Sequence, residues 1–296
     1  MANLTDNDLN RIRGLLSFFI VFLFWIFLGS SISYAISLIV YNISNAAVNS
    51  KEFVFINTNL PFVGMALGIF FSLKYLLNVS LKSLITIHAK FNKRYFVIPF
   101  VISIIYLTLY MIIANKIGYK EVLFNQAPMT DRIILGLLVL LITPLQSALE
   151  ELLFRAILLK GLVGKYSMKN RTLAIAASVI CGLVFVAFHL KNPEMSTYKL
   201  YAFIYYFSFA FASALLTLYF GTVEISIALH VANNLFVALI CNYQDSALQT
   251  VSLFNEVGSN IHYIDLAVTA LILITTFYAL NKYTYSKNGK NGITES

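Results

Sequence analysis

The sequence predicts an all-α protein, a polytopic membrane helix bundle with about eight transmembrane helices. Hydrophobic residues make up 59% of the 296 residues and charged residues only 11%, whereas a typical soluble domain has about 25% charged residues. Apolar runs of about 20 residues, long enough to cross a bilayer as a helix, recur along the chain. Lysine and arginine gather mainly in alternate connections between these runs. We therefore expect an integral, multi-pass membrane protein whose first partner is the lipid bilayer.

Eight apolar runs are long enough to form one transmembrane helix each. Their approximate ranges are 15–40, 57–78, 95–114, 132–160, 171–190, 198–220, 223–243 and 261–281. The first run has no small-residue cleavage site of a signal peptide, so we expect it to be retained. Residues 79–96 are too polar to span, and their alternation of apolar and basic residues fits two structures equally well. One is a short amphipathic helix on the inner leaflet, and the other is a basic connecting loop.

The distribution of positive charge predicts that both termini are cytoplasmic. With this orientation the inside segments carry fourteen lysine and arginine residues and the outside loops six, while Arg155 lies within a span. The net charge of +8 is scattered between apolar runs and forms no basic patch interleaved with aromatic residues. We therefore expect no nucleic-acid partner. The abundance of Ile, Asn, Lys, Phe and Tyr suggests a bacterial cell membrane.

The run at 132–160 carries three charged residues, Glu150, Glu151 and Arg155, within six positions. A charge at the centre of a membrane helix costs at least about 2.5–3.5 kcal/mol, so these residues are expected to serve a site. Glu151 and Arg155 are four apart and can form an ion pair across one helical turn. Glu150 is rotated by about 100° and is the less compensated carboxylate, available as a general base. The alternative is a purely structural triad that joins this helix to a neighbour.

Two further runs supply polar partners. His189 ends the run at 171–190, and the run at 223–243 carries His230, Asn233 and Asn234 on one face. A lone histidine at a helix end is usually a dipole-stabilising residue, and membrane asparagines often only hold helices together. Taken together, however, a carboxylate, two histidines and an amide on three helices can activate a water and stabilise an oxyanion.

These residues form three motifs, EELLFR at 150–155, FVAFH at 185–189 and HVANN at 230–234. In order and type they resemble the EExxxR, FxxxH and HxxxN motifs of the CPBP intramembrane proteases, also called the Abi family. That family comprises the type II CAAX prenyl endopeptidases and bacterial relatives linked to bacteriocin processing and self-immunity. Together the three motifs are specific, although each alone is weak.

The resemblance implies a domain organisation. A four-helix catalytic core would occupy residues 131–245. Accessory transmembrane helices and the basic amphipathic segment would precede it in residues 1–130, and the last transmembrane helix and a polar cytoplasmic tail would follow in residues 246–296.

The resemblance also implies roles for individual residues. The expected catalytic residues are Glu150, His189, His230 and Asn234, and the expected supporting residues are Glu151, Arg155, Phe185 and Asn233. Glu150 and His189 would activate the attacking water, and His230 and Asn234 would stabilise the oxyanion. The direction of the chain places Glu150 in the inner half of its span and His189 near the outer end of its own, so a shared site requires a deep cavity. A separation in depth of more than about two helical turns, roughly 11 Å, would contradict a shared site.

The expected activity is that of an intramembrane endopeptidase acting on a membrane-associated peptide or protein, such as a bacteriocin precursor or signalling peptide. One alternative is a non-catalytic membrane regulator or immunity protein of the same fold that acts by binding. A second is a zinc-dependent protease, because two histidines and a glutamate also form a zinc set. The HExxH motif is absent and the family has no obligatory metal, so no metal or cofactor is expected and zinc ranks second. A transporter is the weakest alternative, since only Pro144 lies near the motifs.

Other polar residues and the two cysteines are expected to have no catalytic role. Glu224 would stabilise a helix dipole, and His262 and Asp265 would lie near the membrane interface. The remaining members of this group are His88, Cys181 and Cys241.

Overall fold

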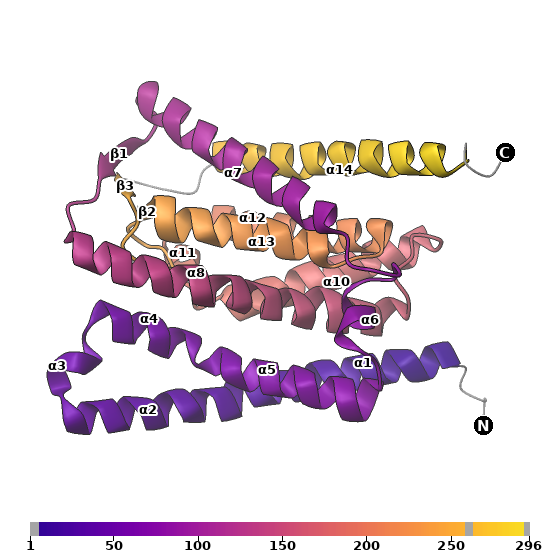
Figure 1. Cartoon of the computed structure of the whole chain (residues 1–296), viewed down its shortest axis with the longest axis horizontal. Coiled ribbons are helices and arrows are strands. Elements are labelled where there is room, and N and C mark those ends of the chain that lie inside the picture. Colours follow the sequence, from indigo (N-terminus) through magenta and orange to yellow (C-terminus); the bar gives the residue numbers. More distant parts are fainter. Residues whose placement is uncertain (1–5, 258–262, 293–296) are drawn as a thin grey trace.

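Helices packed side by side make up most of the chain that the structure, a computed structural model, describes, namely residues 6–257 and 263–292 (Figure 1). The predicted all-α membrane bundle is confirmed. Within these residues, seven helices are long and apolar enough to cross a bilayer, and they are Asn10–Ile43, Lys51–Leu77, Lys93–Lys116, Met129–Val163, Arg171–His189, Lys199–Phe220 and Tyr263–Ser286. The shorter apolar helix Glu224–Ile240 coincides with the remaining predicted span.

The N-terminal layer, along the bottom of Figure 1, consists of two antiparallel helical rods. Their elements are α1 (Asp6–Leu23), η1 (Phe24–Gly29) and α2 (Ser30–Ile43) going out, α3 (Asn45–Val48) at the turn, and α4 (Lys51–Asn59), α5 (Pro61–Phe71) and η2 (Ser72–Leu77) returning. The η segments are wider, π-helical turns. Gly64 lets the rods touch, because a Cβ there would lie 2.4 Å from the carbonyl oxygen of Phe24.

The middle layer contains all three motifs. Its elements are α8 (Met129–Glu151), η3 (Leu152–Leu158), α9 (Leu159–Val163), α10 (Arg171–His189), α11 (Pro193–Thr197), α12 (Lys199–Phe220), α13 (Glu224–Leu235) and η4 (Phe236–Ile240). Helix α10 packs along α12, and α13 packs along α8. The Asn170 side chain caps α10 by accepting a hydrogen bond from the Leu173 amide, as polar N-cap residues commonly do. Gly221, at a φ of +69°, ends α12 in a left-handed turn that leads into α13.

Two long helices form the third layer, along the top of Figure 1. They are α7 (Lys93–Lys116) and α14 (Tyr263–Gly292), and α7 packs on both α13 and α14. Helix α14 extends into the expected polar tail, of which residues 293–296 lie outside the described residues. His262, one of the residues predicted to lie near the interface, is also outside them.

A small three-stranded sheet closes one end of the bundle. Its strands are β1 (Glu121–Phe124), β2 (Cys241–Tyr243) and β3 (Phe254–Val257). Their order is β1-β3-β2, with β3 antiparallel to β1 and parallel to β2. The Lys120 ammonium lies 2.8 Å from Glu256 and 2.9 Å from Asp265. These ion pairs connect β1, β3 and the first turn of α14.

The basic segment 79–96 does not form a helix on the membrane surface. Leu81–Ile85 forms a short helix (α6) in which Leu84 and Ile85 are buried, and the end of the segment, from Lys93, is already the start of α7. The Ile87 amide donates to the Gly221 carbonyl at 3.0 Å, and His88 Nε2 lies 2.9 Å from the Phe220 carbonyl oxygen. The segment therefore packs on the turn between α12 and α13. Of the two structures that fit the sequence, it adopts the connecting segment.

The alternating direction of the helices places the start of α1 and the end of α14 at the same end of the bundle, opposite the sheet (Figure 1). The connections at this end carry most of the lysine and arginine residues that the charge distribution assigns to the inside.

Candidate active site

Glu151, Arg155 and His230 form a polar cluster inside the bundle. Glu151 and Arg155 are fully buried, and His230 is almost so. Glu151 Oε1 lies 3.1 Å from Arg155 Nη1 and accepts a hydrogen bond from His230 Nδ1 at 2.8 Å. The predicted ion pair therefore forms, although the helix widens at Leu152 into the π-helical segment η3. The second partner of Glu151, His230, comes from α13. Glu151 therefore balances the charge of Arg155 and also orients the imidazole of His230.

The ring of Phe185 covers this buried cation. The Arg155 guanidinium lies 4.5 Å from the ring centroid of Phe185, within cation–π distance. The same ring lies 4.2 Å from that of His189 and 6.1 Å from that of His230. Phe185 therefore contacts the arginine and both imidazoles, and a smaller side chain would leave all three with space to move.

Glu150 has different surroundings from Glu151. Its Oε1 accepts a hydrogen bond from the Gln146 side-chain amide, one turn earlier on α8. Its Oε2 lies 3.9 Å from His189 Nε2 and 3.8 Å from His230 Nε2. Among the described residues, this Oε2 has no hydrogen-bond partner. The 100° rotation between consecutive helical residues thus separates one carboxylate that holds Arg155 from one that faces both histidines.

Hydrogen-bond partners determine which nitrogen of each imidazole carries a proton. His189 Nδ1 lies 2.7 Å from the Phe185 carbonyl oxygen, which can only accept, so Nδ1 donates. In a neutral His189 ring, Nε2 is then an acceptor. His230 Nδ1 donates to the Glu151 carboxylate in the same way. The other nitrogen of each ring, Nε2, is the one that lies within 4 Å of Glu150 Oε2.

Asn234 lies one turn beyond His230 on α13. Its amide nitrogen donates to Ser147 Oγ at 3.1 Å, and its oxygen accepts from the Asn233 amide at 3.2 Å. Asn233 in turn accepts from the Tyr205 hydroxyl at 2.8 Å. Since an amide NH₂ group has two protons, one proton of Asn234 remains for a further acceptor.

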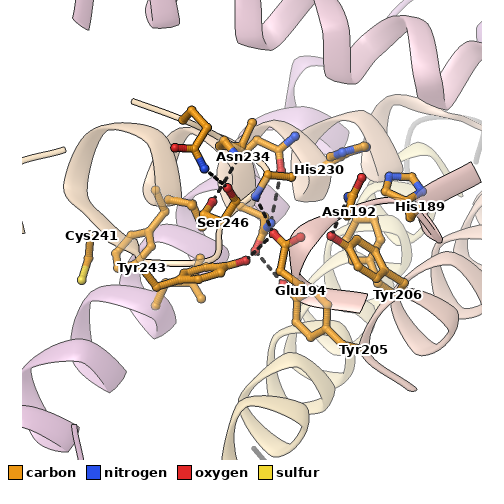
Figure 2. A pocket seen from close by; sticks show the side chains of 18 of the residues that line it. His189, Asn192, Glu194, Tyr205, Tyr206, His230, Asn234, Cys241, Tyr243 and Ser246 are labelled. Carbon is orange, nitrogen blue, oxygen red and sulfur yellow. Dashed lines mark hydrogen bonds between the residues drawn. The ribbon is translucent and has the colours of Figure 1, made fainter. Parts of the chain in front are cut away.

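A cavity of about 420 Å³ joins these side chains. All four expected catalytic residues line it, and so do Phe185 and Asn233. Figure 2 shows His189, His230 and Asn234 around the same space, together with Glu194, Tyr206 and Tyr243. The expected deep cavity is therefore present, and Glu150 lies within 4 Å of both histidines.

The cavity extends beyond the motifs in two directions. Aromatic residues of the N-terminal layer form one wall, where Trp25 stacks on Phe188 at a centroid distance of 5.5 Å. Polar and charged residues near the sheet form the other end, and they include Lys120, Glu194 and Glu256. A bound peptide would thus meet both apolar and charged surfaces in this cavity.

Across the described ranges, no group of three or more His, Cys, Asp and Glu side chains is arranged to hold a metal ion. Glu150, His189 and His230 nevertheless offer the donor types that zinc uses.

Several contacts were not predicted from the sequence. Gln146 could have been found, because it lies four residues before Glu150 and polar residues at this spacing share a helix face. Ser147, Tyr205 and Glu194 could not, because their roles depend on contacts between helices. Glu224 accepts hydrogen bonds from the Asn92 amide and the Thr222 hydroxyl, contacts that agree with its expected non-catalytic role.

Comparison with known proteins tests the resemblance drawn from the motifs. Residues 130–236 match the family described as type II CAAX prenyl endopeptidase Rce1-like. This match, over part of the chain, supports the resemblance to the CPBP/CAAX protease family. The matched segment contains Glu150, His189, His230 and Asn234 and coincides with the middle layer. Together with the seven long apolar helices of the described residues, this match supports an integral multi-pass membrane protein.

The chain is also similar to a bacterial protein, the uncharacterized protein YyaK of Bacillus subtilis strain 168. The two are 28% identical over 229 residues, which is 76% of this chain and 74% of YyaK. This likeness extends well beyond the matched family segment. No solved structure matches the chain.

Proposed function

We propose that this protein is a CPBP/CAAX-type intramembrane endopeptidase that hydrolyses a peptide bond with a water activated by Glu150 and His189. The observation that carries the proposal is the position of Glu150 Oε2, unpartnered among the described residues and within 4 Å of both imidazole Nε2 atoms. One water can bridge atoms at that separation.

The reaction follows from these positions. Glu150 takes a proton from the water while the water oxygen attacks the scissile carbonyl carbon. His189 Nε2 accepts a hydrogen bond from the second hydrogen of the water. The C–N bond of the tetrahedral intermediate then breaks as Glu150 returns the proton to the leaving amine. Each step conserves protons, and no covalent enzyme intermediate forms.

Asn234 and His230 are proposed to stabilise the oxyanion. Asn234 can do so with its remaining amide proton. His230 requires a proton on Nε2 in addition to the one that Nδ1 donates to Glu151, so it would act as the imidazolium. Preorganised donors of this kind commonly contribute 10²–10³-fold each, or about 3–4 kcal/mol.

We propose that the substrate is a membrane-associated peptide or protein of a bacterial cell membrane, such as a bacteriocin or signalling-peptide precursor. The test is to compare the membrane and secreted peptides of cells expressing the wild type and Glu150→Ala. A peptide that is cut only in wild-type cells supports the proposal. Identical peptide profiles from two equally abundant proteins would contradict it and favour a regulator that acts by binding.

Metal dependence is tested on the purified protein. The glutamate mechanism predicts that cleavage persists in a strong chelator and is not increased by added zinc. Loss of activity in chelator that zinc restores would instead support the zinc protease. Glu150→Ala under both conditions controls for contaminating peptidases.

A further inference from the structure

Glu194 is a buried carboxyl group in the cavity that the proposed mechanism does not use. It lies in the first turn of α11, five residues after His189. Its side chain is only 2% exposed and lines the cavity. In Figure 2 it lies between Tyr243 and the pair of Tyr205 and Tyr206.

Only one of its two oxygens has a partner. Glu194 Oε1 accepts hydrogen bonds from the Tyr243 hydroxyl at 2.9 Å and from the Ala247 amide at 2.7 Å. Glu194 Oε2 is buried and has no hydrogen-bond partner in the described part of the chain. A glutamine would supply the same acceptor for both bonds, so holding the loop at 243–247 does not require a carboxylate.

The charge of Glu194 is also unbalanced. No lysine, arginine or histidine within the described residues forms an ion pair with it. The nearby charged side chain that acts on it electrostatically is another acid, Asp245. Desolvation by burial raises the pKa of Glu194, against the lowering effect of its two hydrogen bonds. A buried carboxylate without a counter-charge is costly, and a cation beside it removes much of this cost.

A short path connects Glu194 to the proposed reacting atoms. The ring of Tyr206 lies 4.7 Å from that of His189, and its hydroxyl accepts from the Asn192 amide at 3.0 Å. Asn192 directly precedes α11, and all of these residues line the one cavity. Since an extended peptide advances by about 3.3 Å per residue, a side chain a few residues from the scissile bond can reach Glu194.

We propose that Glu194 forms a subsite for a positively charged group of the peptide substrate, either a lysine or arginine side chain or a free amino terminus. The proposal rests on the proposed function for the identity of the ligand as a peptide. Glu194 Oε2 accepts a charge-assisted hydrogen bond from the cation, while Tyr243 and Ala247 hold the carboxylate in place.

Binding to a non-cleaving protein tests this subsite. The purified full chain carrying Glu150→Gln is titrated with fluorescent, N-acetylated apolar dodecapeptides in which a single lysine occupies each position in turn. The same peptides with glutamine in place of lysine are the reference. At one or two positions, lysine should lower Kd by about tenfold or more, as expected for a hydrogen bond to a charged group. A lysine-free peptide with an unblocked amine separates the two sources of charge.

The preference should depend on Glu194 alone. Glu194→Gln on the same background should bind lysine and glutamine peptides equally, whereas Glu194→Asp, which keeps the charge, should retain a reduced preference. Asp245→Asn is the matched control, because Asp245 carries the same charge nearby but does not line the cavity. It should retain the full preference. Melting temperatures confirm that each variant is folded.

Equal binding of lysine and glutamine peptides by the parent protein would overturn the proposal, and so would a preference that survives Glu194→Gln. These outcomes are independent of catalysis. If the protein prefers lysine peptides but the wild type cleaves none of them, only the proposed function is contradicted. If the wild type cleaves peptides but shows no preference for a positive charge, only the proposed subsite is contradicted.

Discussion

At the scale of residues, two adjacent glutamates have separate partners. Glu151 holds Arg155 and His230 in a fully buried cluster, while Glu150 faces the cavity and the Nε2 atoms of both histidines. The sequence predicts this separation from helix geometry alone, because consecutive residues differ by about 100°. It does not predict that Glu151 also orients His230, since that contact joins α8 to α13.

Glu151→Gln should destabilise the protein. The substitution leaves Arg155 as a buried cation without its counter-charge, and breaking a buried pair on one side costs about 3–5 kcal/mol. Combining it with Arg155→Met removes the unpaired charge and should recover part of the lost melting temperature without full activity. Thermal unfolding in detergent of the wild type and both variants measures this. A single variant as stable as the wild type would show that the ion pair is dispensable.

Glu194→Gln should change the pH dependence of stability. The pKa of Glu194 is raised above its usual 4.5 by burial, so the folded state holds this proton more tightly than the unfolded state. The contribution of protonated Glu194 to the free energy of unfolding is fully present below about pH 4.5, and it is lost as the pH rises through the raised pKa of the folded state. Glutamine cannot titrate. The difference in melting temperature, Glu194→Gln minus wild type, should therefore increase between pH 4.5 and pH 8. A difference that stays constant over this range would contradict the raised pKa of Glu194.

At the scale of elements, glycines allow the accessory layer to pack on the core. A Cβ at Gly161 in α9 would lie 2.9 Å from the Leu15 amide nitrogen and 3.0 Å from the Gly14 carbonyl carbon. Both are backbone atoms of α1, which cannot rotate away. The contact matters for the site because the same rod carries Trp25, which forms part of the cavity wall.

Gly161→Ala should therefore separate α1 from α9 and lower the melting temperature, at a cost of about 1–3 kcal/mol, as for other overpacked sites. Gly136→Ala is the control, because a Cβ there would meet, outside its own helix and among the described residues, only a Leu239 methyl group at 3.9 Å. That substitution should be neutral or stabilising by up to about 1 kcal/mol, given the helix propensities of glycine and alanine. Equal effects of the two substitutions would show that the contact is not tight.

The spans were the most predictable elements, because an apolar run of about 20 residues in a bilayer has few alternatives to a helix. The π-helical segment η3, the sheet and the packing of α6 were not predictable. A π-helical turn has no sequence period of its own, and the strands β1 and β3 pair across 130 residues of chain. The sequence places Glu150 and His189 at different depths in the membrane, which made a shared site difficult to expect. The length of the helix Met129–Val163 removes this difficulty, because the helix has 35 residues and Glu150 lies well inside it.

At the scale of the whole molecule, charge and helix direction together predict the orientation in the membrane. The end with the start of α1 and the end of α14 carries the excess of positive charge, and the sheet closes the other end. By the positive-inside rule, we expect both termini to be cytoplasmic and the sheet to be outside. The polar and charged end of the cavity would then lie toward the outer face.

Single cysteines test this orientation. Gln126 and Lys165 are exposed at the sheet end and the opposite end respectively, and the native Cys181 and Cys241 are buried. A membrane-impermeant maleimide on intact cells should label Gln126→Cys, and it should label Lys165→Cys only after permeabilisation. The reverse pattern would invert the proposed topology.

Cleavage by purified Glu150→Gln tests the central claim most directly, with the peptide identified from wild-type cells as substrate. Glutamine keeps the size of the side chain but removes the base, and loss of a general base typically lowers the rate by about 10²–10⁴-fold. We predict a loss of kcat of that size with a melting temperature close to that of the wild type. Near-wild-type cleavage by Glu150→Gln would contradict the account, as would destabilisation as large as that of Glu151→Gln, because the two glutamates would then act as one structural unit.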